Sequence, residues 1–262
     1  MKIRLLAAIA LAAVLATTAA CGDDSNVAPL AGASSGAAGG TVTVLAAASL
    51  TESFTQIGKD FETANPGTKV TFSFGGSSGL ATQITSGAPA DVFASASPKT
   101  MKTVTGAGDA SSEPVTFVKN QLVIATAKGN PKGIKTLADL TKPGLKVALC
   151  AKEVPCGAAA QTALDASKVK VTPVTLEQDV KAALSKVKLG EVDAALVYRT
   201  DAKAAASDVD GIEFPESAQA INEYPIVVLK AAPNPTGAAA FVAYVQSEPA
   251  LKVLTDAGFQ KP

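Results

Sequence analysis

Two stretches of the chain place serine hydroxyls and small residues directly before a predicted helix. They are Ala46–Glu52 (AAASLTE) and Phe74–Leu80 (FGGSSGL). Backbone N–H groups at the start of a helix lack partners within the helix, so they can hold an anion. Alanine and glycine allow a ligand to approach the backbone closely, and each serine adds a hydroxyl donor. Both stretches are therefore candidate anion sites.

Each stretch also has a purely structural interpretation. Ser49 and Glu52 have the spacing of a capping box, in which Ser49 would only cap the helix that follows. The glycine-serine stretch would be only a flexible loop. It is not a P-loop, because no Gly-Lys-Ser/Thr sequence ends it. The residue patterns alone leave these alternatives open.

The composition excludes several classes of function. The chain of 262 residues contains no histidine, which removes Ser-His-Asp and Cys-His catalysis and histidine-ligated zinc. No cluster of acidic residues has the spacing of metal ligands, so we expect neither an enzyme nor a direct metal site. The 23 basic and 23 acidic side chains balance, whereas nucleic-acid binding needs a basic excess. The 47% apolar share is enough for a sizeable core.

The N-terminus has the pattern of an export signal. Lys2 and Arg4 precede an apolar run from Leu5 to Ala16, and small residues lead to Cys21. This arrangement resembles the lipobox of bacterial lipoproteins, in which the cysteine is acylated. The alternative is a simple signal peptide and an unmodified cysteine. We expect a signal peptide over residues 1–20, lipidation at Cys21 and a flexible tether over residues 21–40, because this segment is rich in glycine, alanine and serine.

Cys150 and Cys156 are the two remaining cysteines. In an exported protein, two cysteines six positions apart predict a disulfide, here between the end of a strand and the start of a helix. The alternative is a redox pair, but the sequence is not Cys-x-x-Cys and no histidine could activate a thiol.

The remainder of the chain alternates between predicted strands and helices. This alternation predicts an α/β protein with mostly parallel sheets, in which ligands bind at the carboxyl ends of strands. The predicted strands cover residues 41–45, 70–74, 91–96, 115–126, 145–150, 169–174, 192–198 and 224–229. The predicted helices cover residues 50–61, 80–86, 134–140, 158–167, 177–188, 236–247 and 249–257, and another starts at Pro98.

Several motifs, in order along the chain, closely resemble the molybdate-binding proteins of bacterial ABC importers. They are AAASLT at 46–51, SSGLA at 77–81, GAPADVF at 87–93, VPCG at 154–157, DV at 179–180, VY at 197–198 with DA at 201–202, and EYP at 223–225. The resemblance implies a two-lobed type 2 periplasmic binding protein fold with two crossing segments. Lobe 1 would comprise residues 41–120 and 225–262, and lobe 2 residues 121–224.

The resemblance also implies which groups hold the oxyanion. Ser49 would use its hydroxyl and N–H, Ser77 its hydroxyl, and Tyr198 its phenol. Cys156 and Val180 would each donate a backbone N–H. Two features depart from the family pattern: Cys156 stands where many members have alanine, and the second loop has more glycine than that of many relatives.

Donor chemistry agrees with these assignments. Molybdate at neutral pH is a tetrahedral dianion that only accepts hydrogen bonds. Hydrogen phosphate carries a proton and therefore needs an acceptor, such as a carboxylate, in its site. Asp91 and Asp179 are interpreted as structural, Asp179 as the acid at a helix start. A sulfate-binding protein is the alternative, because sulfate is also bound by neutral donors.

The resemblance further implies a receptor that captures molybdate, and also tungstate, for a membrane permease. We expect a monomer on the extracytoplasmic side of the membrane, anchored through lipid on Cys21. It would have no cofactor and no nucleic-acid partner.

Overall fold

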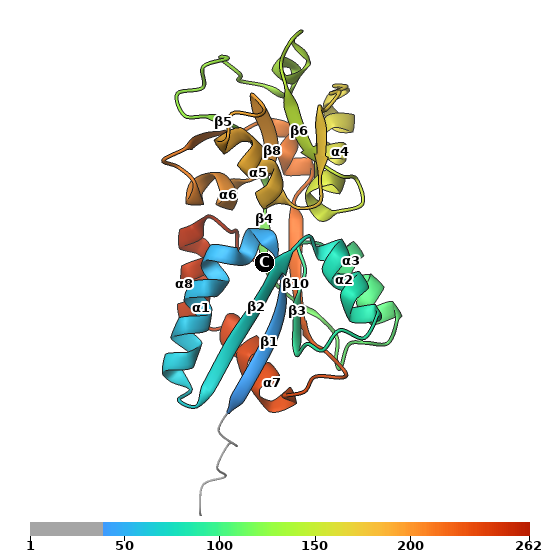
Figure 1. Ribbon diagram of the computed structural model, residues 1–262, viewed down its shortest axis with the longest axis vertical. Helices are drawn as coiled ribbons and strands as arrows, with labels where there is room; N and C mark the ends of the chain where they lie inside the picture. The colour runs from blue at the N-terminus through green and yellow to red at the C-terminus, as the bar shows by residue number, and fades with distance from the viewer. Residues whose placement is uncertain (1–38) are drawn as a thin grey trace, which may run out of the picture. The chain divides into compact units, whose positions relative to one another are not determined.

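The computed structural model describes residues 39–262, which form two five-stranded sheets flanked by helices (Figure 1). The first sheet has the strand order β2-β1-β3-β10-β4, and the second has the order β7-β6-β8-β5-β9. We call the part built on the first sheet lobe 1 and the part built on the second lobe 2. The predicted two-lobed α/β fold is confirmed. The predicted signal peptide, Cys21 and nearly all of the tether lie outside the described residues.

In lobe 1 four strands run in one direction and β10 runs in the opposite direction. Strands β2 and β3 pair parallel with β1, and β10 runs antiparallel between β3 and β4. The strands of this lobe are β1 (Gly40–Ala47), β2 (Thr68–Gly75), β3 (Val92–Ala94), β4 (Val115–Asn120) and β10 (Asn222–Val228). Its helices are α1 (Thr51–Ala64), α2 (Ser77–Thr85), α3 (Pro98–Gly106), α7 (Pro235–Val245) and α8 (Glu248–Ala257).

The core of lobe 1 follows from helix periodicity. Phe54, Ile57 and Phe61 lie on one face of α1, as their spacing predicts, and all are buried. The rings of Phe54 and Phe61 both pack against Phe241 of α7. Behind the sheet, the carboxylate of the buried Asp91 accepts hydrogen bonds from the backbone N–H groups of Thr43 and Asn234 at 2.7 and 2.6 Å. Asp91 is therefore structural, as predicted.

Lobe 2 has a similar organisation. Strand β6 pairs parallel with β7 and β8, and β5 pairs antiparallel with β8 and β9. The strands are β5 (Leu122–Ala127), β6 (Val147–Cys150), β7 (Thr175–Glu177), β8 (Ala194–Tyr198) and β9 (Val209–Ile212). The α-helices are α4 (Pro155–Ser167), α5 (Val180–Lys188) and α6 (Arg199–Ala204). Short 3₁₀ helices are η1 (Ala48–Leu50) in lobe 1, and η2 (Leu137–Thr141) and η3 (Pro215–Gln219).

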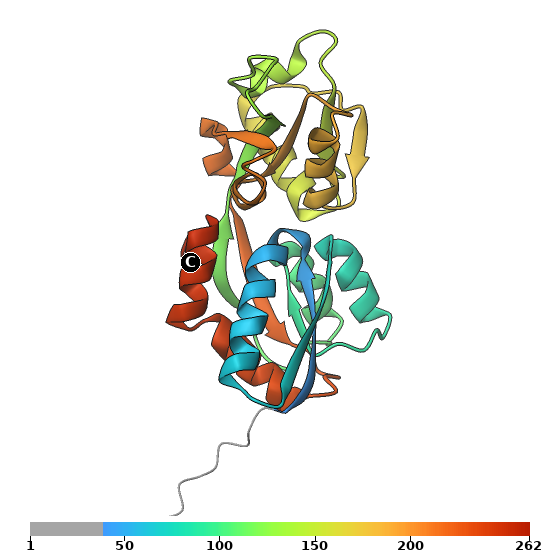
Figure 2. The ribbon, with the colours of Figure 1, turned by 60° about the vertical axis from the view of Figure 1, so that its left-hand side comes forward.

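The chain passes between the sheets at β4–β5 and again before β10 (Figure 2). The single strand predicted over residues 115–126 is two strands, because each half pairs with a different sheet and Gln121 separates them. The expected boundary between Tyr224 and Pro225 falls inside β10. The pairing of β10 with β4 begins at Asn222, and a register irregularity occurs at Tyr224 and Pro225.

Other elements differ from the sequence prediction. Residues 169–174 form no strand; they alternate in exposure, but Pro173 lacks an N–H and ladder pairing begins only with β7. Helix α2 begins three residues before the predicted start at Leu80, and the predicted helix at 134–140 is the shorter η2. The sequence patterns do not predict α6, β9 and η3, which are short. No helix within residues 39–262 has the length and apolar character needed to cross a membrane.

The predicted disulfide between Cys150 and Cys156 is present and joins the end of β6 to the start of α4. The two Cα atoms are 5.8 Å apart. Gly157 fits tightly beside this link, because a Cβ at this position would come within 1.9 Å of the Ala151 carbonyl oxygen. The disulfide and the glycine together hold the first turn of α4 against the strand end.

Replacing both cysteines by alanine should lower the free energy of unfolding by about 2 kcal/mol, because the unfolded chain gains the freedom of a short loop. Urea unfolding of the two proteins measures the difference. Reducing agent should lower the wild-type midpoint and leave that of the double variant unchanged. Equal midpoints for the two oxidised proteins would contradict this role of the disulfide.

Candidate functional site

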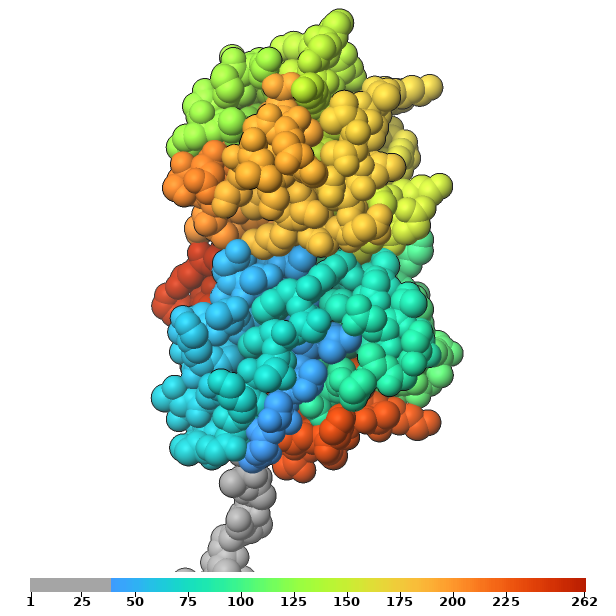
Figure 3. All heavy atoms as spheres, viewed as in Figure 1, coloured from blue at the N-terminus to red at the C-terminus, as the bar shows by residue number. Residues whose placement is uncertain are grey.

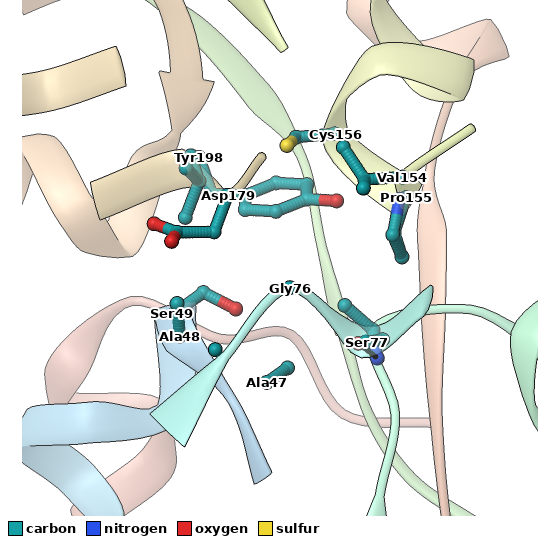
Figure 4. Close-up of a pocket in the computed structure, with 13 residues that line it drawn as sticks. Ala47, Ala48, Ser49, Gly76, Ser77, Val154, Pro155, Cys156, Asp179 and Tyr198 are labelled. Atoms are coloured by element: carbon teal, nitrogen blue, oxygen red, sulfur yellow. Dashed lines mark hydrogen bonds between the residues drawn. The ribbon is translucent and has the colours of Figure 1, made fainter. Parts of the chain in front are cut away.

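A small cavity lies where the two lobes meet (Figure 4). It leaves about 20 Å³ for the centre of a water-sized sphere, and a single water needs about 10–15 Å³ on that measure. This space suits a small inorganic ion better than an organic solute. Lobe 1 contributes Ala47, Ala48, Ser49, Gly75, Gly76, Ser77 and Ala96 to the lining, and lobe 2 contributes Val154, Pro155, Cys156, Asp179, Val180 and Tyr198. All five residues assigned from the sequence are among them.

Ser49 reaches the cavity from η1, directly after β1. The capping alternative for Ser49 does not hold: α1 begins at Thr51, and the structure shows no side-chain cap at its start. The buried Ser49 hydroxyl instead shares a hydrogen bond of 2.8 Å with the hydroxyl of Tyr224. When Tyr224 donates in this pair, the hydroxyl hydrogen of Ser49 is left for a ligand.

Ser77 is the first residue of α2 and is also buried. Its oxygen accepts a hydrogen bond of 3.0 Å from the backbone N–H of Ala96. That bond uses the acceptor capacity of Ser77 and leaves its hydroxyl hydrogen available. The glycine-serine stretch is thus the end of β2 and the first turn of a helix, and it is not a free loop.

Two helices of lobe 2 begin at the cavity. Cys156 is the second residue of α4 and Val180 the first of α5, positions whose N–H groups have no acceptor within their own helix. Asp179 caps α5, because its carboxylate accepts a hydrogen bond of 2.9 Å from the N–H of Ala182. This confirms the interpretation of Asp179 as the acid at a helix start. In Figure 4 its carboxylate points away from the phenol oxygen of Tyr198.

Tyr198 is the last residue of β8, and its phenol oxygen gives the clearest indication of what the site binds. Tyr198 is 1% exposed, and its phenol oxygen lies near the side chains of Tyr224 and Asn222 without a hydrogen bond of regular geometry to any of residues 39–262. Burial, followed by the nearby Tyr224 and Asp201, raises the pKa of Tyr198 well above the ordinary value of tyrosine. The hydroxyl therefore remains a donor, and leaving a buried donor unpaired costs about 1–3 kcal/mol. Because Tyr198 lines the cavity, an acceptor bound there would recover this cost.

Tyr224, Asn120 and Thr200 form a second set of polar residues, which is hydrogen-bonded to the site through Ser49. The sequence indicates no role for them. Tyr224 is fully buried, and burial raises its pKa. The side-chain amide of the buried Asn120 donates to the Thr200 hydroxyl at 2.9 Å and lies 3.5 Å from the Tyr224 oxygen. The sequence motif around Tyr224 was recognised, but nothing in its pattern indicates a hydrogen bond to Ser49, 175 positions away.

Apart from Asp179, whose carboxylate caps α5, the charged groups near the cavity lie outside its lining. Asp201 is fully buried, and burial raises its pKa to about 6 despite the nearby Lys181. Within residues 39–262 no group of three or more His, Cys, Asp or Glu side chains could hold a metal ion. Hydroxyls and helix N-termini from both lobes therefore provide most of the polar lining, an arrangement that suits a small anion.

Three comparisons place the chain among known proteins. The family described as bacterial extracellular solute-binding protein matches residues 42–260. The molybdate-binding protein ModA of Mycobacterium tuberculosis (strain H37Rv) is 45% identical over 251 residues, which cover 96% of this chain and 95% of that protein.

Two solved structures have the same fold. The substrate-binding domain of a putative molybdenum ABC transporter from Clostridium difficile is 29% identical, with a TM-score of 0.63 over 85% of this chain and 99% of that one. The periplasmic molybdate-binding protein of Azotobacter vinelandii is 22% identical, with a TM-score of 0.70 over 84% and 99%. With a family match from residue 42 to residue 260 and a close relative along nearly its whole length, this chain belongs to the bacterial extracellular solute-binding proteins.

Proposed function

We propose that this protein captures molybdate between its two lobes and delivers it to the permease of an ABC importer. The observation that carries the proposal is the buried Tyr198 hydroxyl, which lines the cavity without a regular hydrogen bond to any of the described residues. Ser49 and Ser77 line the same cavity, and the oxygen of each is hydrogen-bonded within the protein. The name of the mycobacterial relative and its 45% identity also support molybdate as the ligand.

The chemistry of the ion fits this donor set. Molybdate accepts hydrogen bonds at every oxygen and donates none, so hydroxyls and helix N–H groups satisfy it. Hydrogen bonds to a charged group are worth about 1.5–3 kcal/mol each, so a few of them can give tight binding. Sulfate offers the same tetrahedral acceptors and is the second candidate. Tungstate has the same charge and geometry as molybdate, and we propose that it binds too.

We propose binding without chemical conversion. The serines of the cavity have no histidine base anywhere in the chain, and the relatives are named as binding proteins. We also propose that the protein acts as a monomer without a cofactor, attached to the membrane through lipid on Cys21. The small residues before Cys21 and the polar segment after it support this anchoring.

Calorimetry of the purified protein with molybdate, tungstate, sulfate and phosphate tests the function directly. Molybdate and tungstate should bind more tightly than sulfate, and phosphate should bind weakest. If sulfate binds more tightly than molybdate, sulfate is the ligand. Absence of binding by all four anions would refute the proposal.

Substitutions in the cavity should separate side-chain donors from backbone donors. Ser49→Ala and Tyr198→Phe each delete one hydroxyl, so affinity for molybdate should fall roughly 10- to 150-fold. Val180→Ala keeps the backbone N–H and should cost much less. Calorimetry on the three variants measures the order. A larger loss for Val180→Ala than for the other two would show that the assigned roles are wrong.

The affinity should change little as the pH rises from 8 to 10. An ordinary tyrosine has a pKa of about 10 and would be half ionised at the upper limit. Burial raises the pKa of Tyr198 well above that value, so its hydroxyl stays a donor and no phenolate repels the anion. Titrations at several pH values measure the profile, with Tyr198→Phe as the control. A tenfold loss that occurs only in the wild type would contradict the raised pKa.

Cys21→Ala should release the protein from the membrane or leave it unprocessed, because lipid can no longer be attached. Fractionation of cells, with N-terminal sequencing of the product, measures both outcomes. Unchanged membrane retention, with a mature N-terminus elsewhere, would rule out anchoring through this residue.

A further inference from the structure

One ion pair joins the two lobes. The Lys181 ammonium of α5 in lobe 2 lies 2.7 and 2.8 Å from the two carboxylate oxygens of Glu52, in the first turn of α1 in lobe 1. All other ion pairs recorded within residues 39–262 join residues of the same lobe. In Figure 3 the blue start of α1 and the gold surface of lobe 2 are in contact along the viewed face.

This ion pair lies beside the cavity but not in it. Lys181 directly follows Val180, which lines the cavity, and Glu52 comes three residues after Ser49. Neither Lys181 nor Glu52 belongs to the lining. The pair therefore connects the segments that carry an anion donor of each lobe.

Lobe 2 itself holds the lysine in place. The Lys181 ammonium is 3.2 Å from a carboxylate oxygen of Asp201, whose side chain is fully buried, while Lys181 is 24% exposed. Burial lowers the pKa of Lys181, but Asp201 and Glu52 together raise it above the ordinary value. Asp201 belongs to the same lobe as Lys181, so this contact does not depend on the position of Glu52. Only Glu52 has to arrive from the other lobe.

The segment around Lys181 also meets lobe 1 on a second side. A Cβ on Gly76 would lie 2.1 Å from the Gln178 carbonyl oxygen, so the absence of a side chain at Gly76 permits this approach. Nearby, the Ser78 hydroxyl donates to the Glu153 carbonyl oxygen at 2.6 Å. Residues 178–181 are therefore in contact with lobe 1 through Gly76 and through Glu52. The ion pair forms only when these surfaces are together.

We propose that Lys181 is a positioning residue that holds the lobes closed by pairing with Glu52, and so slows release of the bound anion without touching it. This inference rests on the proposed function. A ligand that binds the closed form is released through the open form, so stabilising closure lengthens its residence. The partly exposed Glu52 limits the strength of the pair. We therefore expect a change in the release rate of about 1.5- to 5-fold.

Glu52→Gln is the test variant, because it removes the bridge and leaves Lys181 paired with Asp201. Substituting Lys181 instead would leave the buried Asp201 carboxylate without its cation and could disturb folding. Glu191→Gln is the matched control: Glu191 is 48% exposed against 53% for Glu52, and it pairs with Lys186 within lobe 2.

Stopped-flow mixing of the molybdate-loaded full chain with excess competitor measures release, followed by tyrosine fluorescence. Glu52→Gln should release molybdate about 1.5- to 5-fold faster, with little change in the association rate or the melting temperature of the ligand-free protein. Glu191→Gln should behave as the wild type. Equal release rates for Glu52→Gln and wild type, or the same acceleration in Glu191→Gln, would overturn the proposal.

A second measurement keeps this inference separate from the choice of ligand. If the wild type binds none of the tetrahedral anions, the proposed function is wrong and release cannot be measured. Small-angle X-ray scattering of the ligand-free proteins then decides the role of the ion pair. A larger radius of gyration for Glu52→Gln than for Glu191→Gln supports it, and equal radii refute it.

Discussion

The site depends on donors that the protein has buried and left for a ligand. Leaving the Tyr198 hydroxyl without a partner costs free energy, which an acceptor in the cavity would recover. The two serines also offer hydroxyl hydrogens to a ligand, although each serine oxygen is hydrogen-bonded within the protein. Ser49 shares a hydrogen bond with Tyr224 and Ser77 accepts one from Ala96, so the hydroxyl hydrogens can point toward the cavity. Helix starts at α4 and α5 add donors that need no side chain.

Because these donors are divided between two lobes, binding depends on the lobes coming together. Ser49 and Ser77 belong to lobe 1, and Tyr198 and the starts of α4 and α5 belong to lobe 2. Neither lobe alone surrounds an ion, so an anion that contacts both favours the closed arrangement. Small residues make this close approach possible. Gly76 meets the Gln178 carbonyl where any other residue would collide with it, which explains the glycine better than a need for loop flexibility.

Much of the fold could be predicted from local patterns, and the candidate site from the family resemblance. Helical spacing identified the buried face of α1, and the five assigned residues all line one cavity. The errors arose where tertiary contacts decide. A capping box at Ser49 is reasonable from spacing, but a hydrogen bond to Tyr224, 175 positions away, takes its hydroxyl. Apolar and β-branched residues stand on both sides of Lys119–Gln121, so residues 115–126 resemble one long strand, and only the pairing partners distinguish the two halves.

The crossing segments therefore have a chemical role as well as a mechanical one. Asn120 ends β4 beside the first crossing, and its amide donates to the Thr200 hydroxyl of lobe 2. The same amide lies near the Tyr224 hydroxyl, which contacts Ser49 in lobe 1. A buried chain of hydrogen-bonding groups thus runs from lobe 2 through the crossing strand to a donor of the cavity. Because each group in such a chain is costly to leave unpaired, movement at the crossing and the orientation of Ser49 are physically linked.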